Sequence, residues 1–515
     1  MQDTTIRQST TRRRLVVLAA LTLILALGAA LRFYQIGAES YWIDEIYTVT
    51  FAEGNLDSLL HEAQRQDVPI DYFLPLYGWV RLFGTTEAAT RSLSALFGVL
   101  ALLPIYLAGR ELFDDSAGLI AALLAAISEY QIYYSQETRF YSLFGLAAGL
   151  SLFLFARLLR RQDNLSLVLY AFSTWFMFWS MAFGILTIAA QNLYVLLRWR
   201  RYKALRVRWL VCQTAIAIAI VATILPALTD NSIISKDQAG VQWISRPAWS
   251  APLRTLYTFV LPMRYQRPWT AVVISFAAGV GVLLAGTAAY IIRRGRRGWL
   301  SDLKGLLAGA GSLWGKGDEL LLLGLWLLVP IVTLFAWSRI GPPLYHERYV
   351  IGAAPALYLL LAYAIVRARR FVPVPAVLIA LAMIVAPGLQ EYYHADQKEQ
   401  WREAAAYVEQ RRQDSDAVIL APDQDGWQQA CFLWYARDAR PVCGIPIEPA
   451  DDASLNAALR ACLGDRQRFW LIMRGPNSSV DYFRRALVDS DQIGKRLLDR
   501  RDFVGVSVYL FERTE

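Results

Sequence analysis

Charged residues are scarce in this sequence. They make up 18% of its 515 residues, whereas about a quarter of a typical soluble domain is charged. Hydrophobic residues make up 56%, and they gather in long runs, several of which approach the roughly 20 residues that a bilayer-spanning helix needs. This composition excludes a string of soluble domains and predicts an integral membrane protein.

Signatures of metal and nucleotide sites are also missing. The chain has 3 histidines and 4 cysteines without CxxC or HxxxH spacing, and it lacks Walker and Rossmann glycine patterns. We therefore predict neither a metal site nor a nucleotide-binding fold, although a divalent metal is compatible with the sequence. Cys431, Cys443 and Cys462 lie in the polar C-terminal region, where one disulfide is plausible if that region is outside the cytoplasm.

The basic residues that are present lie between the apolar runs. The net charge of +9 therefore indicates cytoplasmic loops rich in Lys and Arg rather than a nucleic-acid-binding face. The runs predict about eleven spans by the bilayer-length rule. They lie at about 15–31, 92–109, 117–134, 141–157, 165–181, 183–199, 209–229, 270–292, 320–337, 350–366 and 372–390.

Arginines orient these spans. They cluster in the loops 157–161, 198–208, 293–304 and 367–370, which would all be cytoplasmic if the N-terminus is. An odd number of spans then puts the C-terminus outside, so we expect a multi-pass protein of the plasma (inner) membrane. The membrane domain 1–390 would carry outer loops at 32–90, 230–269 and 338–349.

The remaining region, 391–515, is polar. Short strand-like segments at 417–420, 441–445, 469–473 and 504–511 alternate with helix-like segments. This alternation predicts a small extracytoplasmic α/β domain.

Two acidic residues, Asp44 and Glu45, follow the first span beside tyrosine and tryptophan. One interpretation is a helix start, where the positive end of the helix dipole favours acids. The other is a general base held at the outer membrane surface. Adjacent residues on a helix point about 100° apart, so only one of the two would face a site.

A second polar segment, 133–141, joins two spans at the outer edge. Gln136, Glu137 and Arg139 lie there among tyrosines such as Tyr141. These groups exceed what an ordinary charged turn needs, which is the alternative interpretation. Arginine also offers a planar fork that binds two phosphate oxygens.

A third segment, 345–349, contains His346, Arg348 and Tyr349 at another outer edge. A metal site formed by His346, His61 and acids is conceivable, but no ligand spacing supports it. Arg348 as a second phosphate contact fits better. The three segments together predict a surface that binds an anionic headgroup with a long apolar tail.

These segments resemble blocks of a known family. The Asp44–Glu45 pair, the Pro-rich stretch 68–77, the block 134–141 and the element 347–349 are similar to those of GT-C membrane glycosyltransferases, in the branch of the protein O-mannosyltransferases and aminoarabinose transferases. Many bacterial relatives have His-Pro-Pro at the position of Val68-Pro69-Ile70, so any role of that histidine is absent here or supplied elsewhere. The resemblance implies a polytopic α-helical GT-C fold.

The resemblance also implies a reaction. The tail of a polyprenyl-phosphate sugar would lie in the bilayer, while a hydroxyl of a protein, lipid or glycan acceptor attacks the anomeric carbon with inversion. Asp44 would deprotonate the acceptor, and Glu45 or Glu137 would orient the site. The residues assigned to phosphate binding are Arg139, Arg348, Tyr141 and Tyr349. Further site candidates are His346, Gln136 and Asp71.

Two other classes compete with a transferase. A lipid-linked glycan flippase or other transporter would place charges near the bilayer midplane and often show paired halves, and the sequence has few such charges and no matching halves. A membrane scaffold would depend on its C-terminal domain to bind glycan or protein.

Overall fold

The computed structural model describes residues 2–64, 69–229, 244–261, 316–369, 373–423, 426–436, 442–446, 452–475, 483–489 and 494–514, so the predicted span at 270–292 lies outside the described residues. The chain divides into two compact units. The membrane unit consists of Met1–Tyr34, Gly54–Leu82 and Arg91–Glu391, and the C-terminal unit of Gln35–Glu53, Phe83–Thr90 and Tyr392–Glu515. The segment expected as one outer loop, 32–90, is therefore shared between the units.

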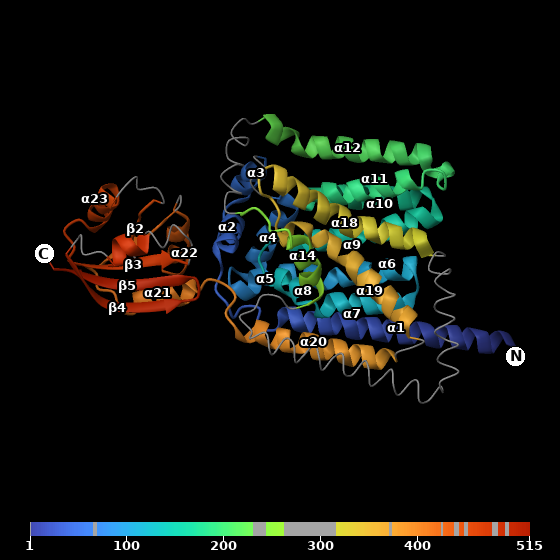
Figure 1. Cartoon of the computed structure of the whole chain (residues 1–515), viewed down its shortest axis with the longest axis horizontal. Helices are drawn as coiled ribbons and strands as arrows, with labels where there is room; N and C mark the ends of the chain where they lie inside the picture. The colour runs from blue at the N-terminus through green and yellow to red at the C-terminus, as the bar shows by residue number, and fades with distance from the viewer. Residues whose placement is uncertain are drawn as a thin grey trace. The chain divides into compact units, whose positions relative to one another are not determined.

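Helices dominate the membrane unit (Figure 1). They are α1 (Gln2–Phe33), α3 (Leu56–Gln64), α4 (Ile70–Phe83), α5 (Glu87–Leu100), α6 (Leu102–Leu112), α7 (Asp115–Ile127), α8 (Glu129–Ser135), α9 (Tyr141–Arg161), α10 (Asn164–Ser180), α11 (Gly184–Leu197), α12 (Arg206–Thr229), α14 (Ala251–Val260), α18 (Gly317–Ile340), α19 (Ala354–Ala368) and α20 (Val374–His394), with short 3-10 helices η1 (Lys203–Leu205) and η3 (Glu347–Ala353).

Within the described ranges, seven helical segments are long and apolar enough to cross a bilayer, or eight if the bent pair of α7 and α8 counts as one span. The predicted runs 165–181 and 183–199 form α10 and α11, which have 17 and 14 residues. The polytopic α-helical architecture predicted from the sequence is confirmed.

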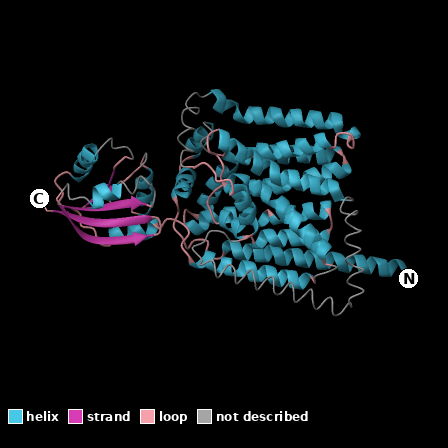
Figure 2. Cartoon of the chain, viewed as in Figure 1, coloured by secondary structure: helices cyan, strands magenta, loops and turns pink. Residues whose placement is uncertain are grey.

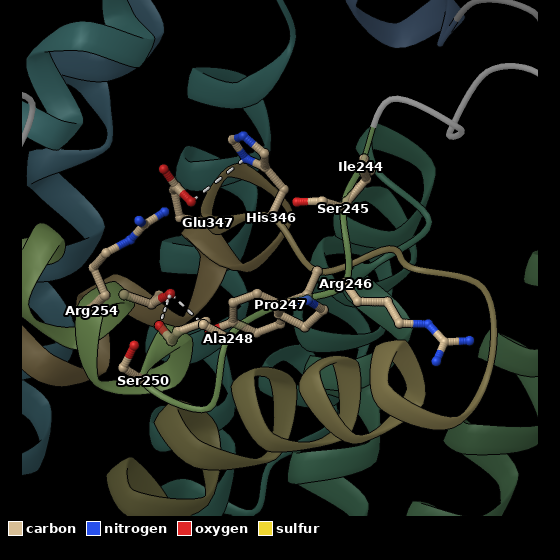
Figure 3. A pocket seen from close by; sticks show the side chains of 12 residues that line it. Ile244, Ser245, Arg246, Pro247, Ala248, Ser250, Arg254, His346 and Glu347 are labelled. Atoms are coloured by element: carbon tan, nitrogen blue, oxygen red, sulfur yellow. Dashed lines mark hydrogen bonds and ion pairs between the residues drawn. The ribbon is translucent and has the colours of Figure 1, made fainter. Parts of the chain in front are cut away.

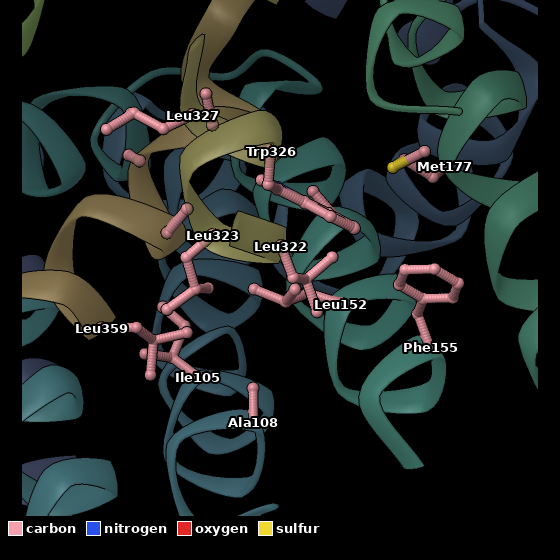
Figure 4. Close-up of a cluster of buried hydrophobic side chains, with 14 of the residues drawn as sticks. Ile105, Ala108, Leu152, Phe155, Met177, Leu322, Leu323, Trp326, Leu327 and Leu359 are labelled. Carbon is pink, nitrogen blue, oxygen red and sulfur yellow. The ribbon is translucent and has the colours of Figure 1, made fainter. Parts of the chain in front are cut away.

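The core of the membrane unit lies between α6, α9, α18 and α19, which pack side by side (Figure 1). Figure 4 shows Leu322 and Trp326 of α18 in the cluster that also contains Leu152 and Phe155 of α9. The buried Trp326 donates its indole N–H to the carbonyl oxygen of Gly352, 2.9 Å away, so the core contains the large ring without an unsatisfied donor.

A sharp break interrupts the predicted span 117–134. Helices α7 and α8 meet at an angle of 61° around Ser128, whose side chain caps α8 by accepting the N–H of Gln131. Arg32, at the end of α1, donates hydrogen bonds to the last carbonyls of α7, at Ala125 (3.1 Å) and Ala126 (3.0 Å). A cation at a helix C-terminus satisfies exposed carbonyls and complements the dipole. These contacts fix how the chain enters the 133–141 block.

The C-terminal unit contains a five-stranded mixed sheet in the order β2-β1-β3-β5-β4 (Figure 2). The strands are β1 (Ala417–Leu420), β2 (Val442–Gly444), β3 (Arg468–Arg474), β4 (Lys495–Phe503) and β5 (Val506–Arg513). Strand β1 pairs in parallel with β2 and β3, whereas β5 pairs in antiparallel fashion with β3 and β4. The α/β domain predicted from the sequence is confirmed.

Alternating side chains give this sheet two apolar faces. Val418 and Trp470 contribute to one face, where α2 (Ile43–Glu53), α21 (Trp401–Glu409) and α22 (Trp427–Tyr435) pack. Ile419 and Leu471 contribute to the other, which α23 (Asp452–Leu463) covers. Helix α2 is thus part of the core of the C-terminal unit although it follows the first span in the sequence.

Candidate active site

The 133–141 block of the membrane unit forms a tight turn between α8 and α9. Glu137 and Thr138 are buried, and the backbone N–H of Arg139 donates to the carbonyl oxygen of Glu137 at 2.7 Å. Helix α9 begins at Tyr141, whose ring lies edge-on to that of Tyr134 with 5.2 Å between centroids. The block therefore presents Arg139 beside a cluster of tyrosine rings.

Arg139 and Arg348 approach the same ring. Their guanidinium carbons lie 6.0 Å and 5.7 Å from the centroid of Tyr141. Arg348 is also 5.3 Å from the ring centroid of Tyr349, which in turn stacks on Phe183 at 4.6 Å. The structure thus brings together the four residues that the sequence assigned to phosphate binding, from two segments more than 200 residues apart in the numbering.

Two hydroxyl groups hold Arg139 in place. Ser94 donates a hydrogen bond to the carbonyl oxygen of Arg139 at 3.1 Å, and the hydroxyls of Ser94 and Tyr72 are 2.8 Å apart. Both Ser94 and Tyr72 are fully buried. Helices α4 and α5 therefore fix the backbone from which the Arg139 guanidinium extends.

Gln136 supports the 133–141 block through backbone contacts. Its side-chain amide donates to the carbonyl oxygens of Arg32 (3.0 Å) and Tyr34 (2.9 Å), so it ties the end of α1 to the block. The amide N–H groups of Gln136 therefore bind backbone carbonyls of the protein itself.

A polar pocket of about 370 Å³ lies beside the 345–349 segment (Figure 3). His346 and Glu347 line it, with 3.9 Å between Nδ1 and Oε2, and Arg254 of α14 lies on the same side as Glu347 (Figure 3). Arg246 also lines the pocket but points away from His346. The hydroxyl of Tyr130 donates to the carbonyl oxygen of Glu347 at 2.7 Å, which connects the pocket wall to the tyrosine cluster.

Asp71 lies in α4, one position before Tyr72. Burial raises the pKa of its carboxyl from 3.8 to about 6, although hydrogen bonding with Ser180 and nearby backbone N–H groups lowers it in part. A carboxyl group with this pKa can exchange a proton near neutral pH.

Asp44 and Glu45 belong to the C-terminal unit, where they lie in the first turn of α2. Glu45 is fully buried and its Oε2 is 3.1 Å from Nζ of Lys398. Asp44 is partly exposed, and its carbonyl oxygen accepts a hydrogen bond from Thr48 at 2.7 Å. This difference in burial agrees with the roughly 100° between adjacent residues on a helix.

Three residues described above, Arg254, Arg32 and Lys398, were not predicted as site residues from the sequence. Arg254 lies on the amphipathic helix α14, and this amphipathic pattern could have pointed to it. Arg32 ends a span and looked like an ordinary membrane flank, and Lys398 has no local signal because its partner is 353 residues away. Among the described residues, no three His, Cys, Asp or Glu side chains gather closely enough to hold a metal ion.

Known proteins resemble the chain in part of its sequence and in its fold. Residues 67–226 match the model of the family described as dolichyl-phosphate-mannose-protein mannosyltransferase. No curated protein sequence matches the chain significantly.

Two solved structures share the fold. ArnT from Cupriavidus metallidurans in the apo state has a TM-score of 0.54 and 13% identity, over 95% of this chain and 97% of that one. The archaeal oligosaccharyltransferase AglB from Archaeoglobus fulgidus, in complex with an inhibitory peptide and a dolichol-phosphate, has a TM-score of 0.50 and 13% identity, over 96% of this chain and 74% of that one. The family match and the shared fold confirm the resemblance predicted from the sequence: the chain has the fold of the GT-C membrane glycosyltransferases, and its residues 67–226 resemble the dolichyl-phosphate-mannose-protein mannosyltransferases.

Proposed function

We propose that this protein is an inverting glycosyltransferase that moves a sugar from a polyprenyl-phosphate donor to an acceptor hydroxyl at the outer face of the membrane. The observation that carries the proposal is the approach of Arg139 and Arg348 to one tyrosine ring in the membrane unit. Both guanidinium groups lie about 6 Å from the centroid of that ring, and the planar fork of arginine binds two phosphate oxygens at once.

The donor phosphate would bind between the two arginines, with Tyr141 and Tyr349 as flanking hydroxyl donors. The matched family is described by a dolichyl-phosphate sugar donor, and the AglB structure contains a dolichol-phosphate, which supports a lipid-phosphate carrier. As the glycosidic bond breaks, negative charge grows on the leaving phosphate. Arginines that are already in place stabilise that charge without reorganisation.

The acceptor hydroxyl would be activated by Asp44. Its oxygen forms a bond to the anomeric carbon, the bond between that carbon and the phosphate oxygen breaks, and the phosphate leaves with the electron pair. Asp44 takes the acceptor proton, and Glu45 or Glu137, both of which are buried, orients the site. Attack from the face opposite the phosphate gives inversion. The pocket beside His346 and Glu347 is our candidate for part of the acceptor or of the sugar, because its lining is polar.

The arginine-rich loops and a disulfide support transfer at the outer face. Cys443 and Cys462 form a disulfide in the C-terminal unit, and structural disulfides persist in oxidising compartments. We therefore propose a plasma (inner) membrane protein with a cytoplasmic N-terminus and an extracytoplasmic C-terminal unit.

The test is a reconstitution in liposomes with a panel of polyprenyl-phosphate hexoses and pentoses, with product detection by mass spectrometry. The acceptor mixture should contain peptides, lipids and glycans, each with and without divalent metal. Asp44→Asn should abolish transfer while the protein still inserts and folds. Arg206→Lys, which changes an arginine over the ring of Trp199 at 5.3 Å, is the matched control.

Unchanged turnover by Asp44→Asn would remove Asp44 from the mechanism. Movement of labelled lipid-linked glycan across the vesicle without a new glycosidic bond would favour a flippase. A scaffold would be favoured if the intact chain transferred no sugar and deletion of 391–515 abolished the effect of the protein in cells.

A further inference from the structure

We propose that Lys398 is a positioning residue for Asp44, so that the C-terminal unit takes part in the reaction by holding α2 in one orientation. This inference rests on the proposed function for its chemistry, and on the buried contact between Lys398 and Glu45 for its geometry. The contact joins the segment before α21 to the helix that carries Asp44.

The ion pair is closed off from water. The side chain of Lys398 is 3% exposed and that of Glu45 is 0% exposed, with 3.1 Å between Nζ and Oε2. Desolvating two charges is unfavourable, and their mutual attraction offsets that cost only when the geometry is good. Each partner therefore holds the other: without Lys398, the buried Glu45 carboxylate loses the ammonium that faces it, which favours a turn of Glu45 toward water.

Turning Glu45 would move Asp44. The two residues are neighbours on α2, about 100° apart around its axis, so a rotation that brings Glu45 to the surface redirects Asp44 by a similar angle. The neighbouring Tyr47 stacks on Trp427 of α22, with 5.5 Å between ring centroids. The ion pair at Glu45 and this stack at Tyr47 both follow Asp44 in the sequence, within one turn of the helix, and together they fix its rotation.

The segment around Lys398 is itself firmly attached. The carboxylate of Glu39 accepts hydrogen bonds from the backbone N–H groups of Gln397 and Lys398. Ser40 donates to the carbonyl oxygen of Glu399, whose carboxylate pairs with Arg474 of β3 at 2.6 Å. The sheet thus provides a rigid base from which Lys398 reaches Glu45.

Further contacts hold the chain just before α2. The hydroxyl of Tyr435 accepts the N–H of Tyr41 at 2.7 Å and donates to Glu87 at 2.7 Å, while Arg402 bonds to Glu87 at 3.2 Å. Since these contacts all lie outside the ion pair, removal of Lys398 alone should leave the unit folded. A loss of activity in a Lys398 variant would therefore report a changed position of Asp44 rather than unfolding of the unit.

The experiment uses the full chain in nanodiscs and compares Lys398→Met, Lys398→Arg and the double variant Glu45→Gln/Lys398→Met with the wild type. We expect Lys398→Met to lower kcat by roughly 10- to 100-fold, the range that follows from misplacing a reacting group by about 1 Å, with the donor KM within about twofold. Lys398→Arg should keep most of the activity because it retains the charge. The double variant should recover at least about tenfold over Lys398→Met, because the side chain that faces residue 398 is then neutral as well.

Hydrogen exchange gives a second readout that does not depend on catalysis. Amides of α2 should exchange faster in Lys398→Met, whereas those of α21 and β3 should not change. The matched control is Arg496→Met, which breaks an exposed pair with Glu512 in the same unit and should alter neither readout.

An unchanged kcat in Lys398→Met, or unchanged exchange in α2, would overturn the proposal. Equal loss of kcat in Lys398→Met and the double variant would also overturn it, because the effect would not depend on the pair. A wild-type chain that transfers no sugar would refute the proposed function instead, and the exchange measurement would still decide whether Lys398 fixes α2.

Discussion

The side-chain amide of Gln136 donates a hydrogen bond of 3.0 Å to the carbonyl oxygen of Arg32, although 104 residues separate them in the sequence. The Arg32 guanidinium in turn bonds to Ser135 at 3.2 Å and to the last carbonyls of α7. The end of the first span and the start of the 133–141 block therefore hold each other. This relationship makes Arg32 a structural support of the candidate site.

Arg32→Met should destabilise the protein by about 3 kcal/mol, because it leaves buried carbonyls at the end of α7 without donors. Transfer should fall with it, since the 133–141 block would lose its support. Thermal unfolding in detergent and the transfer rate measure the two effects. Arg13→Met is the control: its pair with Asp115 is 72% exposed on the arginine side, and such pairs contribute little. Equal stability of the two variants would contradict this role of Arg32.

The proposed phosphate site predicts that donor binding depends on the shape of the cationic side chain as well as on its charge. Arg139→Lys keeps the charge but loses the planar fork, so binding of polyprenyl phosphate should weaken by about tenfold or more. Arg348→Lys should behave alike, and the double variant should lose less than the product of the single losses if both arginines contact one phosphate. Titration with radiolabelled polyprenyl phosphate measures all three. Fully multiplicative losses would show that the two side chains bind independently.

The helices that cross the bilayer were predictable because long apolar runs report them directly. The strand β1 was predicted at its observed bounds because its four apolar residues, which are all buried, stand between polar segments. Strand β4 was missed: its sequence, Lys495–Phe503, is mostly exposed and rich in charge, which suits an edge strand but gives no apolar alternation. The break at Ser128 was also missed, because apolar residues continue on both sides of it.

The site was predictable only in part. The blocks that contain Arg139 and Arg348 could be selected because arginine beside tyrosine at a membrane edge is unusual. Their approach to Tyr141 could not be derived, since it depends on how α9 packs against η3. The pairing of Glu45 with Lys398 gave no signal at all, because contacts across several hundred residues leave no local pattern in one sequence.

The disulfide supports a topology prediction. Cys443 of β2 and Cys462 of α23 close a loop with a separation of 19 residues, which should stabilise the C-terminal unit by about 3 kcal/mol. In intact cells, an impermeant maleimide should label these cysteines only after treatment with an impermeant reductant. Arg200→Cys, in a loop expected to be cytoplasmic, should react only after permeabilisation. Labelling of Cys443 and Cys462 only after permeabilisation would place the C-terminal unit inside.

Asp71 predicts an unusual dependence of stability on pH. Burial raises the pKa of its carboxyl to about 6 in the folded chain, against the 3.8 that is ordinary for an aspartate. Between these values the folded state binds the proton and the unfolded state does not, so stability falls as pH rises through this window. Above pH 6 the full cost, about 3 kcal/mol, is present.

Asp71→Asn removes the ionisable group but keeps its shape. The variant should therefore unfold at a higher temperature than the wild type at pH 7.5, and the difference should shrink below pH 6 and vanish near pH 4. Asp163→Asn is the control, because the pKa of that exposed helix-capping carboxyl is lowered and asparagine caps a helix equally well. If Asp71 also acts in the site, the wild-type transfer rate should change around pH 6 and that change should be absent in Asp71→Asn. A variant that is less stable than the wild type at pH 7.5 would show that the carboxylate has a favourable partner, which would contradict the raised pKa.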